Sequence, residues 1–93
     1  MPTRIEVEPV EQHRYRVSVI EGDARSSHRV SVTPGYYQKL TGGRRTVEEL
    51  IRRSFEFLLE HEPKEAILAE FDLSVIQRYF PDYERDIRRR LNL

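Results

Sequence analysis

The sequence predicts an α+β fold in which a three-stranded antiparallel meander packs on one long helix, followed by short C-terminal helices. Before residue 34, apolar and polar residues alternate in three short runs, which is typical of strands with one buried face. From residue 46, apolar residues recur at helical spacing instead. A chain of 93 residues is long enough for one hydrophobic core, so a single domain over residues 1–93 is expected.

The three strands are expected at residues 3–8, 13–21 and 26–33. Pro9 is expected to end the first strand. Gly22 and Asp23 are typical turn residues and should connect the second strand to the third.

A continuous apolar face sets the expected strand registers. The expected apolar pairs are Val7–Tyr15, Ile5–Val17, Val17–Val30 and Val19–His28. On the outer face, these registers place Glu6 opposite Arg16 and Glu8 opposite Arg14, where opposite charges stabilise a pair modestly. Arg29 would then be the arginine left without a partner.

Two helices are expected after the strands. Thr33 and Pro34 form an N-cap and a first-turn proline for a short helix over residues 34–40, and the glycines that follow stop it. The long helix spans residues 46–62. It begins at a capping box of Thr46 and Glu49 and ends before Pro63. Its apolar stripe comprises Val47, Leu50, Ile51, Phe55, Leu58 and Leu59, with Ser54 as a small gap and Phe57 at the margin.

The remaining chain predicts three short helices. KEAILAEF, residues 64–71, is apolar on most sides and is expected to form a buried helix. Asp72 can cap a helix over Leu73–Phe80. Pro81 begins the last helix, whose narrow stripe comprises Tyr83, Ile87 and Leu91.

Composition excludes several classes of protein. No apolar run is long enough for a membrane span, and the first residues lack the apolar core of a signal peptide. The absence of cysteine excludes disulfides and thiolate chemistry and makes the cytoplasm the default compartment. With 16 basic and 16 acidic side chains, the chain lacks the net basic charge of a generic nucleic-acid-coating protein.

Catalytic and metal-binding patterns are also missing. His13, His28 and His61 have no metal-ligand spacing among them, and His28 is better explained as a packed histidine with one hydrogen-bond partner. The acids at Asp72 and Asp82 are better explained as helix starts. No metal or cofactor is therefore expected, and an enzyme is the least favoured class.

Two patterns could bind anions. Arg44 and Arg45 precede the N-terminus of the long helix, where free N–H groups attract phosphate. A glycine stop followed by a solvated loop explains this stretch better, because Glu48 and Glu49 oppose an anion there.

The other pattern, AILAEFDLSVIQRYF, loosely resembles a helix-turn-helix, in which Arg78 and its polar neighbours could reach base edges. Its turn lacks glycine and its surroundings are acidic, so DNA binding is disfavoured. A small DNA-binding regulator, or an antitoxin-like repressor that uses the Leu73–Phe80 helix, is therefore the alternative function.

Tyrosines near the chain's later helices are candidates for a protein interface, since tyrosine contributes apolar area at low entropy cost. An equally good interpretation is that they complete the edges of the core. The candidate interface residues are Tyr36, Phe57, Tyr79 and Tyr83.

Residues 46–84 carry FEFLLE, EPKEAIL and FDLSVIQRYFPDYE, and this run resembles a group of small, uncharacterised bacterial proteins. HRVSVTPGYY is a weaker point of similarity. The resemblance implies a bacterial cytosolic setting, and it transfers no activity, ligand or catalytic residue.

The leading hypothesis is therefore a non-catalytic protein-interaction module that binds another protein or a second copy of itself, as in a homodimer. Its motivation is the lack of a catalytic pattern, together with two expected surfaces. A small sheet leaves edge strands open, and the apolar stripe of the long helix is wide enough to extend beyond its cover.

Overall fold

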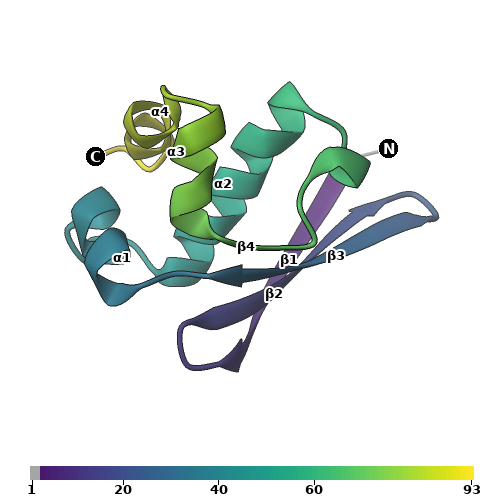
Figure 1. Cartoon of the computed structure of the whole chain (residues 1–93), viewed down its shortest axis with the longest axis horizontal. Coiled ribbons are helices and arrows are strands. Elements are labelled where there is room, and N and C mark those ends of the chain that lie inside the picture. Colours follow the sequence, from purple (N-terminus) through teal and green to yellow (C-terminus); the bar gives the residue numbers. More distant parts are fainter. Residues whose placement is uncertain (1–2) are drawn as a thin grey trace.

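The computed structural model describes residues 3–93 and has an α+β fold, with helices on one face of a four-stranded sheet (Figure 1). In chain order the elements are β1 (Thr3–Glu11), β2 (Arg14–Glu21), β3 (Ala24–Ser31), α1 (Pro34–Thr41), α2 (Val47–His61), the 3-10 helix η1 (Lys64–Ala66), β4 (Glu70–Asp72), the 3-10 helix η2 (Leu73–Val75), α3 (Ile76–Tyr79) and α4 (Tyr83–Arg90). Across residues 3–93, no helix has both the length and the apolar character needed to cross a membrane.

The sheet has the order β1-β2-β3-β4, so the predicted meander is present and gains a fourth strand. β4 runs parallel to β3, with Val30 paired to Phe71 and Ser31 to Asp72. The expectation that residues 64–71 form a buried helix is wrong. The open edge of β3 offers backbone partners to an extended segment, and residues 70–72 pair with it as β4.

β1 continues through Pro9 to Glu11, so the expectation that Pro9 ends the strand is also wrong. β1 is the edge strand, where a proline loses no ladder hydrogen bond if its nitrogen faces away from the neighbouring strand. The pairing shifts between Pro9 and Glu11, and a two-residue turn follows, with His13 at φ 62°.

Both predicted registers are wrong by two residues. Val7 pairs with Val17 and Ile5 with Val19, while Tyr15 pairs with Val30. Both hairpins close with two-residue turns, and turn length fixes the register. A slip of two residues keeps every side chain on its predicted face, so the apolar side of the sheet is still correct.

The starts of the two predicted helices are confirmed. The Thr33 side chain caps α1 by accepting from the Tyr36 N–H at 3.2 Å, and Gly42 ends the helix at φ 61°. For α2, Thr46 Oγ accepts from the Glu49 N–H at 3.1 Å. The reciprocal bond of a full capping box, from the Thr46 N–H to the Glu49 carboxylate, is not formed between these two described residues.

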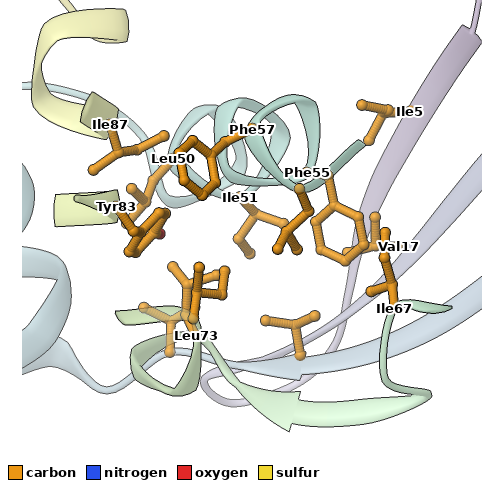
Figure 2. Close-up of a cluster of buried hydrophobic side chains, with 14 of the residues drawn as sticks. Ile5, Val17, Leu50, Ile51, Phe55, Phe57, Ile67, Leu73, Tyr83 and Ile87 are labelled. Atoms are coloured by element: carbon orange, nitrogen blue, oxygen red, sulfur yellow. The ribbon is translucent and has the colours of Figure 1, made fainter. Parts of the chain in front are cut away.

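The core surrounds α2, with the sheet on one side and α4 on another (Figure 2). Tyr83 and Ile87 approach α2 from α4, whereas Ile5 and Val17 approach it from the strands. The predicted helix over residues 73–80 is instead divided into η2 and the four-residue α3. Asp72 does cap its start, by accepting from the Ser74 N–H at 3.1 Å.

Candidate functional site

An apolar groove lies between the segment that follows α2 and the short helix α3. Its volume is about 400 Å³. It is lined by Leu58, Glu62, Ala66, Ile67, Leu68, Phe71, Val75, Ile76, Tyr79 and Phe80. We call this feature the apolar groove.

The C-terminal end of α2 and the chain after it form the floor of the groove. Pro63 follows the last residues of α2, and the chain then turns through η1 into an extended stretch. Leu58, Ile67 and Ile76 are buried and form the floor. Phe80, from the end of α3, is half-buried.

Two exposed apolar side chains from different segments line the groove. Leu68 is 50% exposed on the extended stretch, and Tyr79 is 68% exposed on α3. Among the described residues, the only other large apolar side chain of comparable exposure is Val10, on β1. Two of the three most exposed large apolar side chains in residues 3–93 therefore border the same hollow.

Hydrogen bonds to β3 hold the Leu68 side of the groove in place. The buried His28 ring donates from Nδ1 to the Leu68 carbonyl at 2.9 Å, and the Arg29 N–H donates to the Ala69 carbonyl at 2.8 Å. Ser26 Oγ lies 2.8 Å from His28 Nε2, so both ring nitrogens are satisfied. His28 is a packed histidine, as predicted, although it has two partners rather than one.

Ionic contacts fix the two ends of the same stretch. Lys64 is 7% exposed, and its Nζ lies 2.6 Å from Glu65 and 3.0 Å from Glu21. The hydrogen bond to Glu65, and then that to Glu21, raises the pKa of Lys64.

At the other end, Asp72 accepts from Ser31 Oγ at 2.7 Å and from Ser74 Oγ at 2.5 Å. Burial opposes ionisation of Asp72, but the combined hydrogen bonds outweigh it and lower its pKa. Both ends of this stretch are therefore anchored to the sheet.

The structure places the four predicted interface residues in different environments. Tyr79 is exposed and lines the groove. Tyr36 is half-buried on α1, and its hydroxyl donates to Glu84 of α4 at 2.9 Å. Burial and this hydrogen bond raise the pKa of Tyr36.

For Phe57 and Tyr83, burial favours the alternative interpretation, in which they complete the core. Phe57 is 3% exposed and Tyr83 is fully buried, because α4 covers that flank of α2. Tyr83 points into the core, where its hydroxyl lies 2.6 Å from Ser54 Oγ. The apolar stripe of α2 is therefore covered within the chain rather than left for a partner.

Sequence reasoning missed Leu68 and Glu62 as surface residues. It placed Leu68 inside a buried helix, whereas Ile67 and Phe71 point inward and Leu68 and Glu70 do not. Residues 66–69 are all apolar, so the sequence shows no alternation here, and a strand of three residues is too short to predict from periodicity.

The proposed DNA-reading segment has few free groups. Gln77 Nε2 donates to the Pro81 carbonyl at 2.6 Å, and Gln77 Oε1 accepts from the Glu84 N–H at 2.9 Å. The Ser74 hydroxyl donates to Asp72. Arg78 is exposed, but it stands on a helix of only four residues. A major-groove reader needs a longer helix with several free side chains.

The stretch before α2 also has its polar groups engaged. Arg45 Nη1 donates to the Arg44 carbonyl at 2.9 Å, and the Tyr37 hydroxyl donates to the Arg45 carbonyl. The Glu49 N–H already donates to Thr46 Oγ, so it is not free to bind an anion. This arrangement fits the structural interpretation of the stretch better than a phosphate site.

The outer face of the sheet carries mixed charge. Glu8 lies opposite Arg16, with 3.1 Å between their charged atoms, rather than opposite Arg14. As a result, both Arg14 and Arg29 lack a carboxylate within 4.0 Å among residues 3–93. A cleft of about 380 Å³ contains these arginines, but Glu11, Glu70 and Asp72 line it too. Such balanced charge disfavours a polyanion.

The edges of the sheet are less open than the sequence predicts. β4 covers part of the β3 edge. On β1, Arg52 Nη1 donates to the Ile5 carbonyl at 2.6 Å, and Pro9 has no N–H to offer. Both features weaken the addition of a further strand.

Metal-binding geometry is absent from the described part of the chain, where no three His, Asp or Glu side chains gather closely enough to hold an ion. His61 lies against aromatic rings instead, 4.5 Å from the centre of Phe57 and 5.0 Å from that of Phe80.

Comparisons with models of protein families, with curated proteins and with solved structures find no match for this chain. This agrees with the resemblance of residues 46–84 to a group without an assigned activity. The role of the apolar groove is therefore inferred from the residues that line it.

Proposed function

We propose that this chain is a non-catalytic protein-interaction module that binds a polypeptide in the apolar groove. The observation that carries the proposal is the exposure of Leu68 and Tyr79, which come from two different segments and line one apolar hollow. Exposed apolar side chains gathered at one site mark binding surfaces, whereas scattered ones do not.

The shape of the groove favours a polypeptide over a small molecule. Its volume of about 400 Å³ would suit either ligand. However, a small molecule on the floor would leave the outer parts of Leu68 and Tyr79 in water. A peptide or helix that spans the groove would cover both side chains and remove this apolar area from solvent. Tyrosine is also enriched among the residues that carry binding energy at protein interfaces.

The partner can be a second copy of the chain, since the homodimer expected from the sequence remains part of the proposal. Arg52 already donates to the Ile5 carbonyl on β1, which disfavours pairing of β1 with a strand of a second copy. Self-association through side chains at the groove is therefore favoured over a shared sheet. The absence of cysteine supports a reducing compartment, and the proposal includes the bacterial cytoplasm as the setting.

Site-specific photo-crosslinking in the native host tests this function. The benzophenone amino acid p-benzoylphenylalanine replaces Tyr79, which it resembles in shape, or Asp23, an exposed control residue in the β2–β3 turn. Mass spectrometry then identifies the attached polypeptide, and light scattering on the purified protein shows whether it is a second copy.

We expect a defined adduct from position 79, its loss when Leu68→Glu is added to the same chain, and no such adduct from position 23. Equal adducts at both positions, or an adduct that survives Leu68→Glu, would refute the groove as the binding surface.

A further inference from the structure

We propose that the segment bound in the apolar groove carries a basic side chain, lysine or arginine, that pairs with Glu62. This inference rests on the proposed function and specifies its partner: an apolar stretch of another protein with one cation set among its apolar anchors. The carrying observation is a carboxylate without a partner in the wall of an otherwise apolar groove.

Of the residues in 3–93 that line the groove, only Glu62 is charged. It is half-buried at the C-terminal end of α2, where its N–H donates to the Leu58 carbonyl at 2.9 Å. Within residues 3–93, its carboxylate accepts no side-chain hydrogen bond and lies within 4.0 Å of no basic group. The folded chain therefore gives the Glu62 carboxylate no polar partner.

Neighbouring carboxylates differ from Glu62 in this respect. Glu60, two residues earlier, accepts two hydrogen bonds from Arg90, at 2.9 and 2.7 Å. Glu65, three residues later, is paired with Lys64 at 2.6 Å. The chain thus neutralises the acids on either side of Glu62 and leaves unpaired the one that faces the groove.

Filling the groove changes the surroundings of the unpaired Glu62 carboxylate. A segment that covers Leu68 and Tyr79 also removes water from the Glu62 carboxylate. An ionised carboxylate that loses water without gaining a donor is strongly destabilised. A lysine or arginine on the partner replaces the lost water with a charge-assisted hydrogen bond. Glu62 would therefore discriminate against partners that are purely apolar or acidic.

Arg78 does not provide the missing cation. It is exposed on α3 and is not among the lining residues. A solvated charge outside the contact alters association rates more than affinity. Glu62 therefore sets the charge that the groove prefers in its partner.

Selection from a random library of displayed 12-residue peptides tests the inference. The library is panned against the wild-type chain, against Glu62→Lys and against Leu68→Glu. Wild-type protein should enrich apolar peptides that contain lysine or arginine, and Glu62→Lys should enrich apolar peptides with aspartate or glutamate. Peptides selected on the wild type should fail to bind Leu68→Glu. Thermal unfolding of each variant confirms that it is folded.

A double-mutant cycle then measures the pairing. The strongest wild-type peptide is synthesised with its basic residue intact or replaced by methionine, and fluorescence anisotropy gives Kd for wild type and Glu62→Gln. Replacing the basic residue should weaken binding to wild type roughly ten- to a hundred-fold, the range for a hydrogen bond to a charged group. The same replacement should change Kd for Glu62→Gln by less than about two-fold.

Failure of this inference is distinct from failure of the proposed function. If selected peptides require Leu68 but show no preference for basic residues, or if Glu62→Gln retains the full effect of the methionine replacement, the pairing is wrong and the groove remains a binding surface. If no enriched peptide depends on Leu68, the proposed function itself is wrong, and the inference falls with it.

Discussion

The two flanks of α2 are covered in different ways. On the flank beneath α4, the apolar side chains are buried and the buried hydroxyls of Ser54 and Tyr83 are paired. Tyr83 and Ile87 are fully buried there, and Arg90 of α4 reaches across to Glu60 of α2. On the other flank, the cover is a short extended stretch and a four-residue helix, and it leaves Leu68 and Tyr79 in water.

The closed flank shows how a buried polar pair is satisfied. The Ser54 hydroxyl donates to the Leu50 carbonyl at 2.7 Å, so its one proton is already used. The Tyr83 hydroxyl, 2.6 Å from Ser54 Oγ, must therefore be the donor in that contact. Burial raises the pKa of Tyr83, which keeps the hydroxyl protonated and able to donate.

Residues on the two flanks are expected to serve different purposes, the closed flank folding and the open flank binding. Side chains on the closed flank have their partners within the chain, so their main effect is on folding. Leu68, Tyr79 and Glu62 have few partners within the chain, so their loss should leave folding almost unchanged. Substitutions on the two flanks can test this separation directly.

The largest of these effects is expected at Ser54. Ser54→Ala leaves the buried Tyr83 hydroxyl without an acceptor and should lower the free energy of unfolding by about 1–3 kcal/mol. Tyr83→Phe removes the donor itself and should cost only about 0.5–1.5 kcal/mol. Urea denaturation measures both changes. The double variant should be more stable than the sum of the single changes predicts, and simple additivity would contradict the pairing.

A smaller loss of stability is expected when acid protonates Glu60 and Asp86, the two carboxylates that pair with Arg90. We call these three residues the Arg90 network. Hydrogen bonds from Arg90 lower the pKa of Glu60 below 4.5, and those from Arg90 and then Arg89 lower the pKa of Asp86 below 3.8. Because the folded-state pKa values are lowered, this stability is present above the unfolded values and is lost as pH falls through the folded ones. The free energy of unfolding should therefore decrease as the pH falls below about 4.5.

Urea denaturation between pH 7 and pH 3 measures this loss in wild type and in Arg90→Gln, where the decrease should be shallower. Arg85→Gln is the matched control, because the Arg85–Asp82 pair is almost fully exposed and exposed pairs contribute little. Identical pH profiles for wild type and Arg90→Gln would show that the network does not stabilise the closed flank.

The smallest effect on stability is expected on the open flank. Leu68→Ser and Tyr79→Ser should each change the free energy of unfolding by no more than about 0.5 kcal/mol, the usual range for exposed positions. Thermal and urea unfolding measure this. Ile67→Ala, next in sequence but 6% exposed, is the control and should cost about 2–5 kcal/mol. A loss of that size at Leu68 would place it in the core and remove it as a binding residue.

Prediction from the sequence was most accurate where local chemistry decides the structure. Thr33 and Thr46 begin their helices as expected, and Gly22 lies in the turn between β2 and β3. It was least accurate after Pro63, where KEAILAEF consists of helix-forming residues without an apolar alternation, and yet β4 begins at Glu70. Tyr83 shows the same limit: its place in a helical stripe was read correctly, but its burial depends on Ser54, 29 positions earlier.

The sequence by itself therefore determined the α+β class, the first three strands, α1, α2 and the inward faces of the sheet, because each depends on residues close together in the chain. Only the tertiary structure decided the strand registers, the parallel strand β4 and the apolar groove. These depend on which distant segment satisfies the open edge of β3 and which one covers α2. That competition between segments far apart in the chain leaves no local pattern in the sequence.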